Sequence, residues 1–352
     1  MRIPTEPVGS IPRPAVLLEG MHAHASGLID DKELDRLFES ALKDTLRQLE
    51  ATGSPVLSDG EQTKPSFATY PIAGLPGLNP NGVVISFADG HQRQLPALTG
   101  GPFRYRTYAS SYLEKARRFS GMPIKQAVIS VSALSLLYPQ EGIEGYDRAQ
   151  FLEDLAGEAE TDIRRCLDRA AHVVQVDFTE GRLALKLDPS GALLQSFIDL
   201  NNQVLSRFTE EERRRIGIHS CPGGDHDSTH SADVPYGALL PYLFQLQAGN
   251  FYLEYAAEPD KPSVLASIKK HARPSARIFL GVTNVLNPRV ETPEEVRDLI
   301  LEAAAVLPAR QLGTTDDCGF SPFADDTSTS RAIAFAKIQA RVRGTWLAEG
   351  VL

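Results

Sequence analysis

Cysteine is scarce in this sequence, with three residues in a chain of 352. They are too few and too far apart to form a disulfide framework. In a reducing compartment, an isolated thiol is more often buried, metal-bound or catalytic. Cys166, Cys221 and Cys318 therefore each need a separate explanation.

Long apolar runs are also missing. The longest, AVISVSALSLLYP and YGALLPYLFQL, fall short of the roughly 18 to 20 residues that a membrane-spanning helix needs. The first segment, MRIPTEPVGSIPRP, is interrupted by proline and charge and lacks the apolar centre of a secretory signal. We therefore expect a cytoplasmic protein.

Positive charge is outweighed by negative charge. The chain has 36 Lys and Arg against 45 Asp and Glu, a net charge of −9, which argues against nucleic-acid or anionic-membrane partners. Hydrophobic residues make up 42% and charged residues 23%, as in ordinary globular proteins. Composition leaves the oligomeric state open.

Short β-branched or apolar runs alternate with helical patterns along the chain. A first strand is expected to end at Gly9, and the other runs span 55–59, 127–132, 172–177, 216–220, 250–256, 277–283 and 311–316. Eight strands, each followed by a helix, are typical of a (β/α)₈ TIM barrel. A doubly wound open sheet is the alternative, but the early strands are not followed by a Gly-rich phosphate-binding turn. We predict a single α/β barrel domain over residues 1–352.

Local patterns add detail to this barrel. Residues 61–126 are too long for one βα unit, and we predict an insertion after the second strand with a β-hairpin turning at Asp89-Gly90. A capping box of Thr292 and Glu295 predicts a helix start. An earlier helix is expected to end at Gly53, and another buries Cys166 on its apolar face.

Polar residues follow the predicted strands, at the end of a barrel where active sites lie. They are Gly9, Ser10, Asp59, Glu61, Asp177, His219, Cys221, Glu254, Asn284, Asp316, Asp317 and Cys318. Residues two apart in a strand point to the same side, so His219 and Cys221 can bind one ion. With Glu254 and Cys318 they form a ligand set that suits Zn²⁺.

Each of these residues also has an ordinary structural interpretation. A His-x-Cys pair can simply be buried in a strand, Cys318 can be a core thiol, and Glu254 can pair with Lys261 or Arg289. Asp177, at the end of VVQVD, would be costly to bury unless it is paired or functional, and it can instead anchor Arg182 or a neighbouring strand. The loop Asp225 to His230 can cover the site, supply a general acid or be a solvated loop.

At these residues the chain resembles the catalytic half of cobalamin-independent methionine synthase and its shorter relatives in the uroporphyrinogen decarboxylase-like barrel superfamily. The similar segments are VGSIPRP, SDGEQTKPSF, VQVD, IHSC, FYLEYA, LGVTNVLNPRVETPEEV and TTDDCGF, in the family's order and over nearly the whole chain. A series of this kind is much more specific than any single motif.

The resemblance implies an activity and roles for residues. It implies zinc bound by His219, Cys221, Glu254 and Cys318, substrate binding by Gly9, Ser10 and Glu61, and catalysis by Asp177. Zinc would bind homocysteine as a thiolate, which takes a methyl group from a 5-methyltetrahydrofolate-type donor. The partners would be a small-molecule thiol and an alkyl donor.

One position departs from the family. A histidine that protonates the leaving pterin nitrogen corresponds here to Leu286, which cannot donate a proton. A second relative, epoxyalkane:coenzyme M transferase, needs an acid for an alkoxide, for which His226, His230 or Asp177 are candidates. The sulfonate group of coenzyme M would need a cationic partner such as Arg13 or Arg289.

Other functions remain as alternatives, among them alkyl transfer to a different thiol and the reverse lyase reaction. A zinc- or thiol-binding protein without turnover would use the same ligands. A porphyrinogen decarboxylase of this superfamily needs no metal, so the ligand set argues against it. A hydrolase with Cys221 as nucleophile is disfavoured, because Pro222 and Gly223 follow it directly and His219 lies on the same strand.

Overall fold

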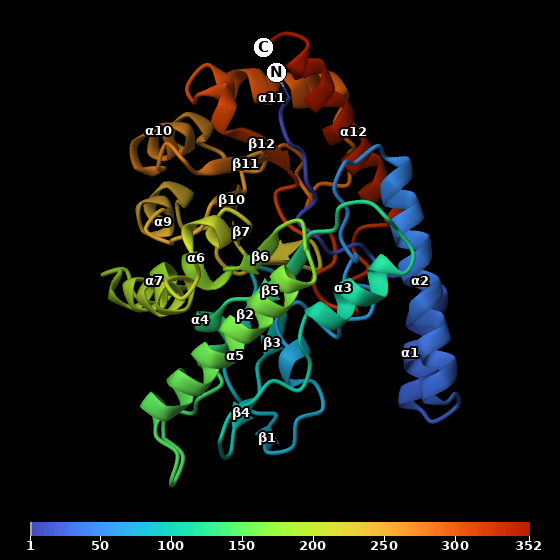
Figure 1. The fold of residues 1–352 in the computed structure, drawn as a ribbon, viewed down its shortest axis with the longest axis vertical. Coiled ribbons are helices and arrows are strands. Elements are labelled where there is room, and N and C mark those ends of the chain that lie inside the picture. The colour runs from blue at the N-terminus through green and yellow to red at the C-terminus, as the bar shows by residue number, and fades with distance from the viewer. Residues whose placement is uncertain (1) are drawn as a thin grey trace.

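A parallel sheet forms the centre of the computed structural model, which describes residues 2–352 (Figure 1). Its six strands lie in the order β12-β11-β10-β7-β6-β5. Their bounds are β5 Gln126–Ile129, β6 Val174–Asp177, β7 Ile216–Ser220, β10 Asn250–Leu253, β11 Arg277–Gly281 and β12 Leu312–Thr315. All are buried except for Arg277, because helices cover the outer face of the sheet.

Two extended segments lie between the edge strands β12 and β5. Thr5 forms a parallel bridge with Thr314 of β12, and Leu57 forms one with Ile124 just before β5. The segments are joined to each other, since Ile11 N–H donates to the Gly60 carbonyl at 3.0 Å. The predicted barrel is thus present, with these two segments completing the ring.

The prediction of regular first and second strands is wrong, because each is reduced to a single bridge. Pro4 and Pro7 flank Thr5, and Pro55 lies two residues before Leu57. Proline has no N–H to donate to a ladder, so neither segment can pair along its length. The predicted strand over 127–132 is also too long, because Ser130 caps a helix that begins at Val131.

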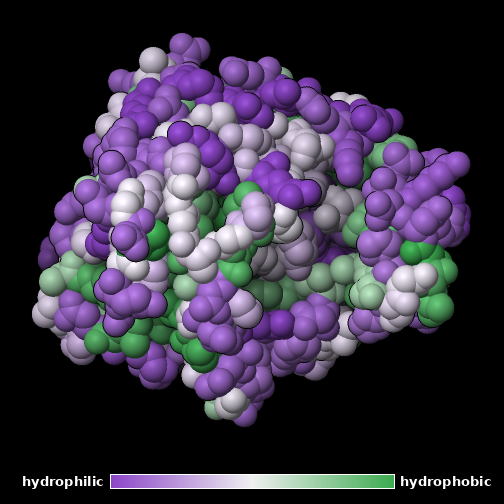
Figure 2. Space-filling view, turned by 90° about the horizontal axis from the view of Figure 1, so that it is seen from below, coloured by the Kyte–Doolittle hydropathy of each residue, from purple (hydrophilic) through white to green (hydrophobic). Residues whose placement is uncertain are grey.

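The helices follow the strands around the barrel. They are α1 Ala15–Ala25, α2 Asp31–Ala51, α3 Ser110–Arg117, α4 Val131–Ser135, α5 Arg148–Asp168, α6 Glu180–Leu187, α7 Ala192–Leu205, α8 Glu210–Arg213, α9 Tyr236–Leu243, α10 Lys261–His271, α11 Pro293–Ala304 and α12 Arg331–Glu349. Within residues 2–352, none of them combines the length and apolarity that crossing a membrane requires. The face seen in Figure 2 is largely hydrophilic, with apolar side chains in smaller patches.

The predicted helix signals are confirmed. Thr292 accepts from Glu295 N–H while Glu295 accepts from Thr292 N–H, which is the expected capping box of α11. Helix α2 ends at Ala51, and Gly53 follows with a φ of 82°. Cys166 is fully buried on α5 and packs in the main hydrophobic core.

The segment between Leu57 and β5 carries two small antiparallel pairs. Strand β1 (Leu78–Asn79) pairs with β4 (Ala97–Leu98), and β2 (Val84–Ser86) pairs with β3 (Gln92–Gln94). The β2–β3 hairpin turns through Gly90, whose φ of 93° favours glycine. A third pair, β8 (Gly224–Asp225) with β9 (Ser228–Thr229), follows β7.

Candidate metal centre

A cavity of about 620 Å³ lies where the barrel strands end. Residues from the predicted site line it: Gly9, Ser10, Glu61, Asp177, His219, Cys221, His230 and Cys318. They come from segments spread over three hundred residues of chain, and the barrel brings them together. Further lining comes from side chains that the sequence did not point to: Phe67, Ile85, Phe87, Arg93 and Phe323.

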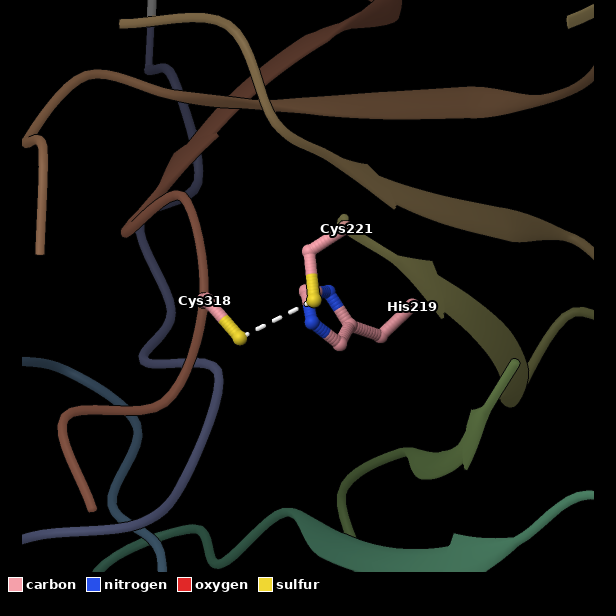
Figure 3. Close-up of side chains that lie close together, drawn as sticks. All are labelled: His219, Cys221 and Cys318. Carbon is pink, nitrogen blue, oxygen red and sulfur yellow. Dashed lines mark hydrogen bonds between the residues drawn. The ribbon is translucent and has the colours of Figure 1, made fainter. Parts of the chain in front are cut away.

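His219, Cys221 and Cys318 point toward one another in this cavity (Figure 3). The first two lie at the end of β7 and just beyond it, and Cys318 lies three residues after β12. One ligand atom from each lies within 4.8 Å of the other two, and the two sulfurs are 3.0 Å apart. All three side chains are buried, so they form a compact set of one nitrogen and two sulfur donors.

The imidazole of His219 is oriented for metal binding. Its Nδ1 lies 3.2 Å from the Tyr252 carbonyl oxygen. A carbonyl can only accept, so Nδ1 carries the proton and Nε2 keeps its lone pair. Nε2 is buried and has no hydrogen-bond partner among the described residues. A metal ion at this point would satisfy that orphaned atom, and a carbonyl behind the ring is the usual support of a metal-bound histidine.

The two thiols have opposite pKa shifts. The pKa of the Cys221 thiol is lowered well below its ordinary value by its hydrogen bond with Cys318 and also by His219. The same hydrogen bond and burial raise the pKa of Cys318. Burial opposes the charging of His219, but Cys221 and Asp177 together outweigh it and raise the pKa of the imidazole. Protein groups alone therefore favour one thiolate here, whereas a divalent cation would stabilise two.

Glu254 lies outside the compact ligand set. It follows β10, and its Oε2 accepts from Arg182 Nη1 at 2.9 Å. The two partners proposed from sequence are engaged elsewhere, because Lys261 donates to the Glu258 carbonyl and Arg289 pairs with Glu295. Glu254 and Cys318 nevertheless line one small cavity of about 230 Å³. The carboxylate is thus beside the centre, held by an arginine.

Asp177 ends β6 inside the main cavity. Its Oδ1 accepts from Gln175 Nε2 at 2.7 Å, so the predicted alternative of an anchor for Arg182 is wrong. Burial raises the pKa of Asp177 to about 7. A carboxyl group with this pKa can hold or release a proton near neutral pH.

The two candidate histidines of the following loop differ in position. His230 lines the cavity, and burial lowers its pKa to about 4, so its imidazole is neutral at pH 7. His226 lies outside the cavity wall, within 4.8 Å of Asp225 and Asp326. The His230 ring packs against Gly223, where the Cβ of any other residue would collide with it.

Of the predicted substrate-binding residues, some line the cavity and Arg13 does not. Glu61 lines the cavity and pairs with Lys64 at 2.9 Å, and Ser10 lines it beside Gly319, where a Cβ would strike the Ser10 hydroxyl. Arg13 does not line the cavity. Its buried guanidinium donates to the backbone carbonyls of Glu61 and Lys64, both at 2.7 Å, and so anchors their loop.

Residues 3–335 match the family described as cobalamin-independent synthase, catalytic domain.

The chain belongs to this family.

Relatives of this synthase family resemble the chain over most of its length. A methionine synthase from Sulfurisphaera tokodaii is 24% identical and covers 97% of this chain and 91% of its own. One from Saccharolobus islandicus is 22% identical and covers 97% and 94%. The solved B12-independent methionine synthase from Shewanella, in complex with selenomethionine, superposes with a TM-score of 0.77 at 18% identity, over 100% of this chain and 99% of that one. The predicted family and barrel fold are confirmed.

Part of the cavity wall of this synthase-family chain comes from the β2–β3 hairpin. Arg93 of β3 pairs with the buried Asp225 and, at 2.9 Å, with Asp325, and its guanidinium lies 4.2 Å from the centre of the Phe323 ring. His91 stacks on Phe87, with ring centres 4.3 Å apart. No sequence motif marks Arg93 as a cavity residue, because its partners Asp225 and Asp325 lie more than a hundred positions away.

We expect Arg93→Met to loosen the hairpin over the cavity. Removing Arg93 leaves the buried Asp225 carboxylate without its arginine partner, and burying an unpaired charge is costly. Amide hydrogen exchange in residues 84–95 is expected to become at least about tenfold faster, because local opening becomes easier. Arg36→Met, which removes an exposed pair with Glu33, is the control. Unchanged exchange in the hairpin would show that Arg93 does not hold it.

Proposed function

We propose that this protein is a zinc-dependent methyltransferase that methylates the thiol of homocysteine, using a 5-methyltetrahydrofolate-type donor. The observation that carries the proposal is the buried set of a His219 ring nitrogen, Cys221 Sγ and Cys318 Sγ, all within 4.8 Å of one another, in the wall of a cavity. Membership of the cobalamin-independent synthase family supports the reaction class.

The ligand set supports zinc as the metal. One imidazole and two thiolates are donors that Zn²⁺ prefers, and three protein ligands leave a fourth position for a substrate or for Glu254. When bound, zinc lowers the pKa of a substrate thiol and holds the thiolate as a nucleophile. The Tyr252 carbonyl keeps His219 in the tautomer that this role needs.

Other cavity residues fit the two substrates. The Glu61 carboxylate, fixed by Lys64, is placed to accept the ammonium group of an amino-acid substrate. In the transfer, a sulfur–carbon bond forms as the donor's nitrogen–carbon bond breaks, and the leaving nitrogen needs a proton. Asp177 is the cavity residue that we assign to supply it, because its pKa of about 7 leaves much of it protonated at neutral pH.

The cavity residues say less about the alkyl donor than about the thiol substrate. Phe67, Phe87 and Phe323 give the cavity aromatic faces, on which a pterin ring can stack. Leu286 offers no proton and lines the neighbouring small cavity, which favours alkylation by an epoxide as the second candidate. The sulfonate of coenzyme M is poorly served, because Arg13 is bonded to carbonyls and Arg289 to Glu295.

The direct test is product formation by the zinc-loaded protein. We expect about one zinc per chain, an added sulfur neighbour in zinc X-ray absorption on addition of homocysteine, and methionine when 5-methyltetrahydrofolate is supplied. Zinc with no added sulfur would exclude homocysteine as the thiol. Added sulfur without methionine would exclude the folate donor, and an epoxide would then be tried.

Cysteine variants test the ligand assignment. We expect Cys221→Ser and Cys318→Ser to lose most of the bound zinc, since each removes a thiolate ligand. Cys166→Ser changes the third cysteine, which is buried in the core away from the cavity, and should keep the metal. Zinc content measured by mass spectrometry, with circular dichroism to check folding, distinguishes them. Equal zinc in all three variants would contradict the assignment.

Asp177→Asn tests the proton donor. The substitution keeps the shape of the side chain and the neighbouring Gln175, so zinc binding should be unchanged. Turnover should fall by about 10² to 10⁴, the usual contribution of a positioned acid. Steady-state methionine formation measures it. Turnover close to that of the unmodified protein would remove Asp177 from the mechanism.

A further inference from the structure

Arg182 of α6 is among the largest fully buried side chains of the described residues. It donates a hydrogen bond to Glu254, which lies beside the proposed metal centre. One nitrogen, Nη1, donates both to Glu254 at 2.9 Å and to Glu258 at 2.6 Å. The other, Nη2, donates to the backbone carbonyls of Ala232 and Val234. Four acceptors thus hold the guanidinium in one place, and it cannot follow a moving carboxylate.

The backbone that carries Glu254 is equally fixed. Asp317 accepts from the N–H groups of Tyr255 and Ala256 with Oδ1, both at 2.9 Å, and from Ala257 with Oδ2 at 2.8 Å. Asp317 directly precedes Cys318, so this contact locks the Glu254 segment to a proposed metal ligand. Only the side chain of Glu254 remains free to change partner.

The charges around Arg182 do not balance. One guanidinium faces two buried carboxylates, so Glu254 can leave while Glu258 still neutralises the arginine. A divalent ion held by two thiolates and a neutral imidazole would carry no net charge and can accept one more anion. Glu254 and a substrate thiolate are the two anions that can fill that position, and only one of them fits in a tetrahedral site.

We infer that Arg182 is a positioning residue that competes with the metal for Glu254, and that Glu258 sets the balance of this competition. With the carboxylate on Arg182, the fourth metal position is open to the substrate thiol; with the carboxylate on the metal, the position is closed. This inference rests on the proposed zinc function and adds to it the pair of residues that decides when the site opens.

Two variants should move the balance in opposite directions. In Glu258→Gln, Arg182 keeps Glu254 as its only anionic partner, and releasing it would leave a buried cation unpaired. We expect the Kd for zinc to rise about tenfold and homocysteine to bind the metal more tightly. In Arg182→Met, Glu254 loses its donor and should bind the metal instead, so zinc should bind more tightly and homocysteine more weakly.

The measurements do not depend on turnover. Chelator competition gives the Kd for zinc, and the visible spectrum of the Co²⁺-substituted protein reports coordination as homocysteine is titrated. Glu158→Gln is the control, because Glu158 is a buried carboxylate bonded to Tyr108 and the Tyr105 N–H instead of to an arginine of the site. If Arg182→Met does not fold, Glu258→Gln decides alone.

The outcomes distinguish a failure of the competition for Glu254 from a failure of the proposed zinc function. Opposite shifts in the two variants, with the control unchanged, support the competition. Zinc and homocysteine affinities like those of the unmodified protein, or shifts of both variants in one direction, overturn it while leaving a working zinc methyltransferase intact. Failure of the unmodified protein to bind zinc overturns the proposed function and this inference together.

Discussion

The parallel register of β6, β7 and β10 is the constraint on which the site depends. It pairs Asp177 with His219, and His219 with Tyr252. The same register supplies the Tyr252 carbonyl that sets the tautomer of His219. A slip of one residue would turn His219 away from the cavity, because side chains alternate between the two faces of a strand. The donor set is therefore fixed by backbone hydrogen bonds.

Sequence reasoning located the cavity residues better than their partners. The ends of parallel strands meet at one edge, so His219, Cys221, Asp177 and Cys318 could be brought together by counting strands alone. The prediction of regular first and second strands was wrong, because the prolines in these segments lack the backbone N–H groups that strand pairing requires. The partner of Glu254 was also missed: Arg182 lies on a helix 72 residues earlier, and no local pattern links the two.

Several charged side chains are buried in the barrel, and most of them have a partner of opposite charge. Arg341 pairs with Asp316 at 2.7 Å, and Lys64 pairs with Glu61 at 2.9 Å. Lys125 lies farther from its carboxylate, 3.8 Å from Glu6, and burial lowers the pKa of this lysine to about 7. Such buried pairs form at a cost in desolvation, so each charge in the interior needs a partner.

The hairpin that covers the cavity changes what those charged groups can do. Ile85 and Phe87 give one wall of the cavity an apolar surface, and Arg93 is paired with Asp225 and Asp325 instead of adding a free cation to the site. Electrostatic interactions strengthen as water is excluded. Under the proposed function, a substrate thiolate beside these apolar side chains would be less solvated, and therefore more nucleophilic, than one in an open cleft. The insertion would then contribute to the chemistry of the proposed centre, although it lies far from the candidate ligands in the sequence.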